Sequence, residues 1–149
     1  MTVGYKRPES VLVVIYTADL QVLLLERAKH PGYWQSVTGS REDGESFLAT
    51  AVREVHEETG LSISPEKLDV WPGENVYTIM PEWRHRYAPD VTHNHERVFS
   101  LCLPTPREIC IAPEEHRAWR WVPWQEAATA CFSASNREAI LRLPVISQS

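Results

Sequence analysis

The sequence has few cysteines and no long hydrophobic run, and both absences narrow the class of protein. Its three cysteines, Cys102, Cys110 and Cys131, are odd in number and show no Cys-x-x-Cys spacing. They argue against a disulfide framework or a structural zinc site and indicate reduced thiols. The aliphatic run from Val11 to Tyr16 is far below the roughly 20 residues of a membrane span. It is also short for a signal peptide. We therefore expect a soluble, cytoplasmic protein with no membrane partner.

The sequence also lacks an excess of positive charge. It has 15 Lys and Arg against 20 Asp and Glu, a formal net charge of −5. Such a chain gains no general electrostatic help in binding long nucleic acids, so a nucleic acid polymer is not an expected partner. A small polyphosphate can still bind where metal ions and a few basic residues supply a local positive field. No linker or repeat divides the 149 residues, so we expect one domain over residues 1–149 and favour a monomer.

The most informative stretch runs from Gly39 to Leu61. A polar loop between Gly39 and Gly44 reads as a turn. Ser46 is suited to cap a helix, and Gly60 is suited to end it after a run without Gly or Pro. One apolar stripe of this predicted helix is formed by Leu48, Ala51, Val52 and Val55. That spacing predicts a helix packed inward along one face.

Three glutamates, Glu54, Glu57 and Glu58, share another face of the predicted helix. Their Cβ atoms are expected roughly 5–6 Å from each neighbour, which is destabilising for like charges unless a cation lies between them. Mg²⁺ or Mn²⁺ is the natural partner for such oxygen ligands. A solvated acidic helix face is the alternative. Arg53 fits either interpretation, because it can pair with one carboxylate.

This stretch resembles the Nudix box, Gly-x5-Glu-x7-Arg-Glu-U-x-Glu-Glu-x-Gly-U, where U is bulky and aliphatic. All fixed positions are filled, by Gly39, Glu45, Arg53, Glu54, Val55, Glu57, Glu58, Gly60 and Leu61. The resemblance implies a Mg²⁺-dependent hydrolase, with Mn²⁺ as a substitute, that cuts a phosphoanhydride in a nucleoside diphosphate linked to another group. It also implies an α/β/α sandwich with a central mixed β-sheet between helices. Periodicity alone predicts only one domain with α and β elements.

The resemblance also implies roles for the residues of the box. Glu54, Glu57 and Glu58 become the catalytic metal ligands, and the Gly39 carbonyl adds a further ligand. Arg53 is expected to orient a glutamate. The structural positions are Glu45, which braces the loop, and Gly60 at the end of the helix.

A further metal ligand is expected outside the box. In many Nudix proteins a carboxylate upstream of a Trp-Val strand completes the metal site. Glu115 is the candidate here and Glu114 the reserve, since both precede the predicted strand with Trp119 and Trp121. The alternative is that both are solvated loop carboxylates.

The segment before the box points to a substrate. Many Nudix proteins have Trp-x-x-Pro-Gly-Gly here, whereas this chain has Trp34-Gln35-Ser36-Val37-Thr38-Gly39-Ser40. That run resembles the subgroup that hydrolyses dihydroneopterin triphosphate, an intermediate of folate synthesis. Further likenesses are Tyr5-Lys6-Arg7-Pro8, His85-Arg86-Tyr87-Ala88-Pro89 and Ser135-Asn136-Arg137. The implied reaction leaves dihydroneopterin monophosphate and pyrophosphate.

Two other functions stay open at this stage. One is a housecleaning triphosphate pyrophosphohydrolase acting on dATP or oxidised dGTP, and the other is a catalytically inactive nucleotide-sensing Nudix module. The intact glutamate set argues against the sensor. For a triphosphate substrate we expect contacts from Lys6, Arg27, Trp34, Gln35, Thr38, Tyr77, Arg84 and Ser133. Each of these side chains could equally be core or surface.

Three structural predictions complete the sequence analysis. Residues 83–96 are interpreted as a long polar loop, either a lid or substrate wall or a solvated excursion. A short strand is predicted at Ile109 to Ala112. A final helix is predicted to be capped by Ser135-Asn136 and ended by Pro144. His93 and His95 lack a third ligand at a matching spacing, so zinc is not expected.

Overall fold

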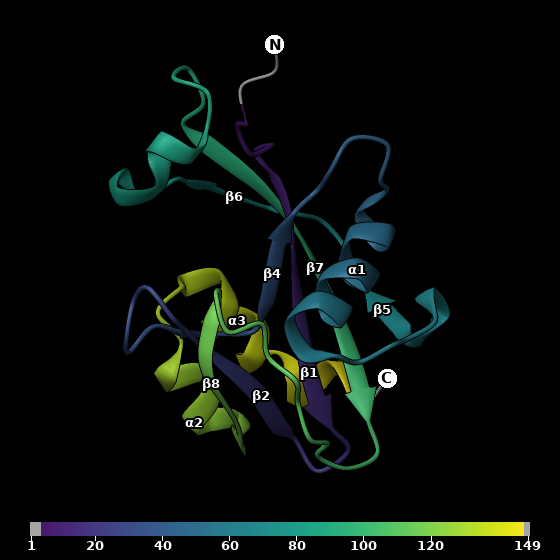
Figure 1. The fold of residues 1–149 in the computed structure, drawn as a ribbon. Helices are drawn as coiled ribbons and strands as arrows, with labels where there is room; N and C mark the ends of the chain where they lie inside the picture. The colour runs from purple at the N-terminus through teal and green to yellow at the C-terminus, as the bar shows by residue number, and fades with distance from the viewer. Residues whose placement is uncertain (1–3, 148–149) are drawn as a thin grey trace.

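The computed structural model describes residues 4–147, and its centre is an eight-stranded sheet (Figure 1). The strands are β1 (Glu9–Thr17), β2 (Gln21–Arg27), β3 (Trp34–Gln35), β4 (Val37–Ser40), β5 (Leu68–Val70), β6 (Asn75–Thr78), β7 (His93–Leu103) and β8 (His116–Pro123). The α-helices are α1 (Phe47–Thr59), α2 (Trp124–Ala130), α3 (Ala134–Leu141) and α4 (Leu143–Ile146). Two 3₁₀ helices, η1 (Pro65–Lys67) and η2 (Pro81–Arg86), lie in the connections.

Strand β1 is the central strand of this mixed sheet. It pairs in parallel with β7 along its whole length, from Glu9 opposite His95 to Thr17 opposite Leu103. On its other side it pairs antiparallel with β4 and, near its end, with β2. Strand β2 continues the sheet to β3 and β8, and β7 continues it to β5 and β6. Segments far apart in the chain therefore meet around β1.

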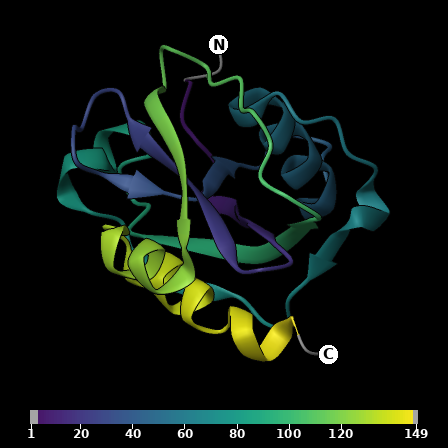
Figure 2. The same ribbon diagram turned by 90° about the horizontal axis from the view of Figure 1, so that it is seen from below.

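The two faces of β1 bury two separate hydrophobic clusters. Val11, Val13 and Ile15 pack in one cluster with Ala51 and Val55 of α1. The alternate residues, with Leu12 and Val14 among them, pack in the other cluster beneath α2 and α3. Coverage of both faces explains why β1 is a continuous apolar run rather than an alternating one. Figure 2 shows α1 on one side of the sheet and the yellow C-terminal helices on the other, so the predicted sandwich is confirmed.

Helix α1 begins and ends where its sequence signals predict. The Ser46 hydroxyl accepts from the Ala49 N–H at 3.0 Å, and Gly60 adopts φ 78° while its N–H donates to the His56 carbonyl. A positive φ there favours glycine. Ala51 and Val55 are fully buried against the sheet. With this face packed on the sheet, Glu54 of the same helix lies against the backbone of Gly39 in β4.

The predicted loop over residues 83–96 is wrong at both ends. Pro81–Arg86 is the 3₁₀ helix η2, and His93 to Glu96 belong to β7. The strand extends this far because β1 supplies a parallel partner as far back as Glu9. That pairing joins segments more than 80 residues apart, so no local pattern announces it.

Two smaller predictions are also corrected. Residues 109–112 form no strand. Ile109 is buried, but the segment's backbone bonds are one from the Cys110 N–H to the Thr59 carbonyl and two turn bonds to the Ala112 carbonyl, from the Glu115 and His116 N–H groups. The N-cap of α3 is Ser133 and not the predicted Ser135-Asn136, so the helix begins earlier than expected. Pro144 lies in the first turn of α4, where its missing N–H has no partner to lose, so it does not end the helical region.

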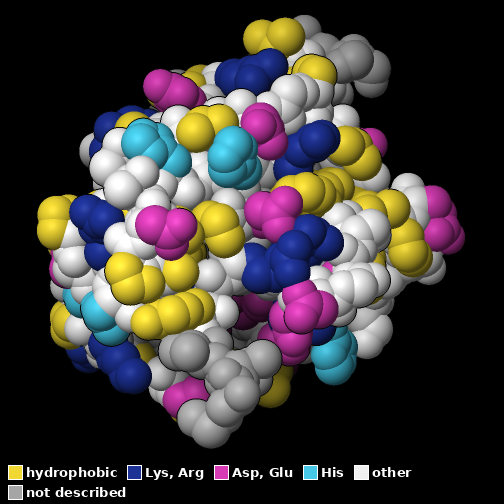
Figure 3. Space-filling view, turned by 90° about the horizontal axis from the view of Figure 1, so that it is seen from above, with side chains coloured by type: hydrophobic (Ala, Val, Ile, Leu, Met, Phe, Trp, Pro, Cys, Tyr) yellow, Lys and Arg dark blue, Asp and Glu magenta, His cyan; other side chains and the backbone are white. Residues whose placement is uncertain are grey.

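The surface carries mixed charge and offers no membrane-spanning element. On the face shown in Figure 3, Lys and Arg side chains lie interspersed with Asp and Glu side chains. Within residues 4–147, no helix is both long and apolar enough to cross a membrane.

Candidate active site

A cavity of about 1080 Å³ lies between α1, η2 and the start of α3. Its walls include Glu54 and Glu58 from α1, Trp83 from η2, and Ser135 from α3. Ligand pockets usually fall between roughly 300 and 1,000 Å³, so this one is large enough for a nucleotide-sized molecule. The box therefore faces a binding space and not open solvent.

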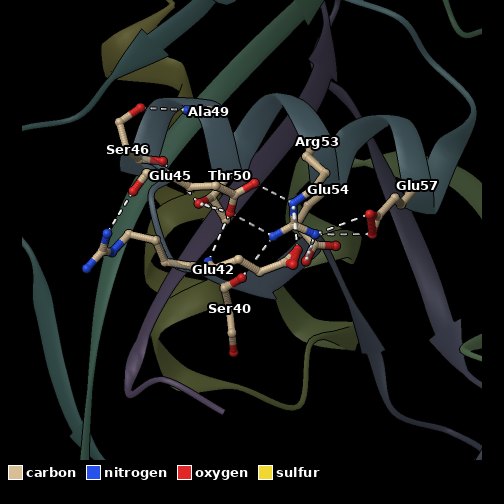
Figure 4. Close-up of polar contacts among 10 residues, drawn as sticks. Ser40, Glu42, Glu45, Ser46, Ala49, Thr50, Arg53, Glu54 and Glu57 are labelled. Atoms are coloured by element: carbon tan, nitrogen blue, oxygen red, sulfur yellow. Dashed lines mark hydrogen bonds and ion pairs between the residues drawn. The ribbon is translucent and has the colours of Figure 1, made fainter. Parts of the chain in front are cut away.

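Arg53 fastens the loop before α1 to the helix itself (Figure 4). Its Nε donates to Glu45 at 2.6 Å, and its Nη2 donates to the Ser40 carbonyl at 3.0 Å. Its Nη1 lies 3.2 Å from both Glu54 and Glu57. One guanidinium thus fixes the loop and two of the box glutamates, and such planar multidentate pairing is specific to arginine.

Glu45 is held as an anion and is not one of the residues that line the cavity. It accepts from Arg53, from the Glu42 N–H at 2.9 Å and from the Thr50 hydroxyl at 2.9 Å. The bond from Arg53 is the main cause that lowers the pKa of Glu45 to about 2. A carboxylate with this many donors braces the loop over the pH range of the cell.

Glu58 and Glu54 are buried acids that lack full compensation. Glu58 is 2 % exposed and its Oε1 has no hydrogen-bond partner, although the Thr38 N–H donates to the carboxylate. Burial, followed by the charges of Glu54 and Glu115, raises the pKa of Glu58 well above its usual value. Burial also raises the pKa of Glu54 to about 7, against the opposing effect of Arg53. Buried carboxylates of this kind are costly unless a cation joins them.

Gly39 allows Glu54 to reach its position. A Cβ built on Gly39 would lie 1.9 Å from Glu54 Oε2 and 2.0 Å from its Cδ. Any side chain at residue 39 would therefore displace the carboxylate. The glycine is required by this close approach, since the structure gives it no positive φ.

The donor set fits a hard divalent cation. Glu58 offers an unpartnered buried oxygen, Glu54 lies against the Gly39 backbone, and Glu57 and Glu115 line the same cavity. Among residues 4–147, no three acidic, His or Cys side chains already converge as metal ligands. Arg53 instead holds Glu54 and Glu57. A cation would compete with that guanidinium for the two carboxylates.

Most of the predicted site residues line the cavity. They are Lys6, Arg27, Gln35, Thr38, Gly39, Arg53, Glu54, Glu57, Glu58, Tyr77, Glu114, Glu115 and Ser133. Lys6 and Arg27 lie close enough to each other and to Arg86 that repulsion and, above all, burial lower the pKa of Lys6 to about 8. The three cations line the same cavity as the carboxylates and supply the local positive field that phosphate binding needs.

Trp34 and Arg84 do not line the cavity, so their expected substrate contacts are corrected. Trp34 packs in the core beneath α2, and the Arg120 guanidinium stacks on its ring at 4.2 Å. Arg84 borders a separate shallow pocket, while Arg86 lines the cavity instead. Successive residues of a 3₁₀ helix point about 120° apart, so recognising η2 as helical separates these two arginines.

Sequence reasoning missed His116 next to the carboxylates. It is 2 % exposed, its Nε2 lies 3.4 Å from Gln35 Nε2, and it is 4.0 Å from Glu58 Oε1. Burial, and then the charge of Arg27, lowers the pKa of His116 to about 4, so the imidazole is neutral. Its position at the start of β8, directly after Glu115, was the available signal.

Comparison with known proteins agrees with this geometry. The sequence matches the NUDIX domain over residues 6–143. The chain belongs to the Nudix family. It is 45 % identical over 139 residues to the dihydroneopterin triphosphate diphosphatase of Escherichia coli K12, covering 91 % of each chain. It is 41 % identical to the Haemophilus influenzae protein of the same name, over 91 % of this chain and 87 % of that one.

Solved Nudix structures match the fold as well. The E. coli dihydroneopterin triphosphate pyrophosphohydrolase superposes with a TM-score of 0.89 at 43 % identity, over 97 % of this chain and 99 % of that chain. A Caenorhabditis elegans Ap4A hydrolase superposes with a TM-score of 0.70 at 20 % identity, over 93 % of this chain and 96 % of that one, a likeness of fold alone. The predicted Nudix membership is thereby confirmed.

Proposed function

We propose that the chain hydrolyses dihydroneopterin triphosphate to dihydroneopterin monophosphate and pyrophosphate. One observation carries the proposal: the buried carboxyl groups of Glu54 and Glu58 line the same cavity as the cations Lys6 and Arg27. Acidic groups for a cation and basic groups for phosphate are the two requirements of metal-assisted phosphoanhydride hydrolysis. The names of the E. coli and H. influenzae relatives support the choice of the pterin substrate.

We further propose Mg²⁺ as the cation, with Mn²⁺ as a substitute. Glu54, Glu57 and Glu58 would hold it, with Glu115 and the Gly39 carbonyl as additional oxygen ligands. When bound, Mg²⁺ neutralises phosphate oxygens that otherwise repel the attacking water. Oxygen ligands without sulfur or imidazole suit Mg²⁺ and Mn²⁺ better than zinc or copper.

The protein side chains then have separate tasks. Lys6, Arg27 and Arg86 bind the phosphates. Arg53 holds the box carboxylates and the loop in one arrangement, through the contacts of Figure 4. Preorganised charges of this kind lower a barrier because they need no rearrangement during the reaction.

The proposal also covers the oligomeric state and the cellular compartment of the enzyme. We also propose that the protein acts as a monomer. The three cysteines, Cys102, Cys110 and Cys131, are unpaired. Unpaired thiols suit a reducing compartment, which supports the cytoplasm as the location.

The position of the broken bond tests the proposed reaction. With dihydroneopterin triphosphate and Mg²⁺, phosphorus NMR is expected to show pyrophosphate and a phosphate monoester from the first turnover. Glu54, Glu57 and Glu58 would hold the cation at the triphosphate, where its positive charge would favour loss of pyrophosphate through cleavage of the α–β bridge. A dominant orthophosphate signal, or no turnover at saturating Mg²⁺, contradicts the proposal.

A further inference from the structure

Two buried polar residues of β7, Asn94 and Glu96, form one wall of the cavity away from the box. They alternate with exposed His95, and Val98 continues the same face into the core beneath α3. Asn94 is 1 % exposed and Glu96 is 4 % exposed, yet both line the cavity. Polar side chains on a face that elsewhere is apolar call for a functional explanation.

Asn94 presents an unused acceptor. Its Nδ2 donates to the Ser10 hydroxyl at 2.7 Å and to the Tyr77 hydroxyl at 3.0 Å, which uses both of its N–H groups. Its Oδ1 is buried and has no hydrogen-bond partner. A buried acceptor left in this state costs about 1–3 kcal/mol unless a ligand or water fills it.

Glu96 is a second acceptor beside it. Asn75 Nδ2 donates to Glu96 Oε1 at 3.2 Å, and the Ser135 hydroxyl also donates to the carboxyl group. No ion pair of the described residues includes Glu96. Burial raises the pKa of Glu96, and a further N–H donor from a ligand would stabilise its anion.

The distance between the Nudix box and the wall formed by Asn94 and Glu96 matches the length of a flat ring that carries phosphates at one end. Strands β4 and β7 flank β1, with Ser40 and Glu96 both opposite Ser10. Their backbones are therefore two strand spacings apart, roughly 10 Å. A molecule with its phosphates at the glutamates and Lys6 would bring the far end of its ring to Asn94 and Glu96.

We propose that Glu96 and the Asn94 Oδ1 form an acceptor pair that binds the exocyclic amino group at the end of the ring remote from the phosphates. The pterin part of this inference rests on the proposed function. The phosphate-bearing side chain of a pterin and its amino group lie at opposite ends of the bicycle. Adenine likewise carries its amino group opposite the sugar. Hypoxanthine carries an oxygen there, which would face two acceptors.

A conservative substitution should reverse this preference. In Glu96→Gln the amide oxygen can keep the bond from Asn75, which leaves the amide NH₂ facing the ring. A donor then replaces an acceptor and favours the oxygen of hypoxanthine over the amino group of adenine. We expect the ratio of kcat/KM for dATP to that for dITP to fall by at least about tenfold, and kcat/KM for dihydroneopterin triphosphate to fall by a similar factor.

The ratio of two triphosphates within one preparation is insensitive to the fraction of folded enzyme. Glu74→Gln is the matched control, because Glu74 pairs with His95 and Arg97 on the outer face of the same strand. It should leave the ratio unchanged. An unchanged dATP to dITP ratio in Glu96→Gln overturns the acceptor pair. Failure of the proposed function would appear differently, as poor use of dihydroneopterin triphosphate by the wild type while the purine ratio still responds to Glu96→Gln.

Discussion

Glu58→Gln is expected to lower kcat/KM by at least about a thousandfold, which corresponds to roughly 4 kcal/mol of transition-state stabilisation. The substitution exchanges a charged metal ligand for a poor one at nearly constant volume. Glu58 is 2 % exposed, with a buried Oε1 that has no partner. Removing a buried charge of this kind should leave the melting temperature unchanged or raise it.

The measurement is steady-state kinetics at saturating Mg²⁺, with thermal melting of the metal-free protein alongside. Glu66→Gln is the control, because Glu66 is exposed on η1 and lies outside the cavity. It should behave as the wild type in both assays. Retention of a tenth of wild-type kcat/KM by Glu58→Gln would remove Glu58 from the metal site. A large loss of stability would show that its charge is compensated by the protein alone.

Gly39→Ala should cause the second large loss, at least about a hundredfold in kcat/KM with a small change in stability. The new Cβ would lie 1.9 Å from Glu54 Oε2, so the carboxylate has to move away from the Gly39 backbone. The atoms that move are the end of a flexible side chain, which limits the cost to the fold. The cost to catalysis is large because the displaced carboxylate would hold the cation less firmly.

Gly4→Ala provides the matched control, since a Cβ there meets nothing within 4 Å. Steady-state kinetics and thermal melting of both variants show whether Gly39→Ala loses activity while it keeps its stability. Near wild-type activity of Gly39→Ala would mean that the position of Glu54 in this structure is not the one used in catalysis. Raising the Mg²⁺ concentration should recover part of the lost activity, because the substitution weakens the site without removing a ligand.

Local signals in the sequence were enough to predict α1 and its acidic face. Ser46 and Gly60 define its ends, and the apolar stripe through Ala51 and Val55 defines its inner side. The rest of the α/β/α sandwich was predicted from the resemblance to the Nudix family and not from local signals. The centre of strand β1 was also visible in the sequence, because residues 11–15 are an unbroken aliphatic run.

Features that depend on pairing between distant segments were not predictable. The polar wall of Asn94 and Glu96 exists because β7 lies beside β1 and β6, and no local pattern specifies that neighbour. Trp34 was expected at the ring of the substrate, but the aromatic side chain is used in the core beneath α2. Arg86 replaced Arg84 in the cavity for a similar reason, since the direction of each depends on η2.

Competition between triphosphates tests the central claim most directly. All candidates share the triphosphate, so the cation and its glutamates cannot discriminate among them, and selection has to come from the ring. We predict that kcat/KM for dihydroneopterin triphosphate exceeds that for dATP and for dGTP by at least about tenfold, or 1.4 kcal/mol, at one pH and one Mg²⁺ concentration. Equal or higher values for dATP would contradict the pterin assignment and favour a housecleaning triphosphate pyrophosphohydrolase on the same Nudix fold.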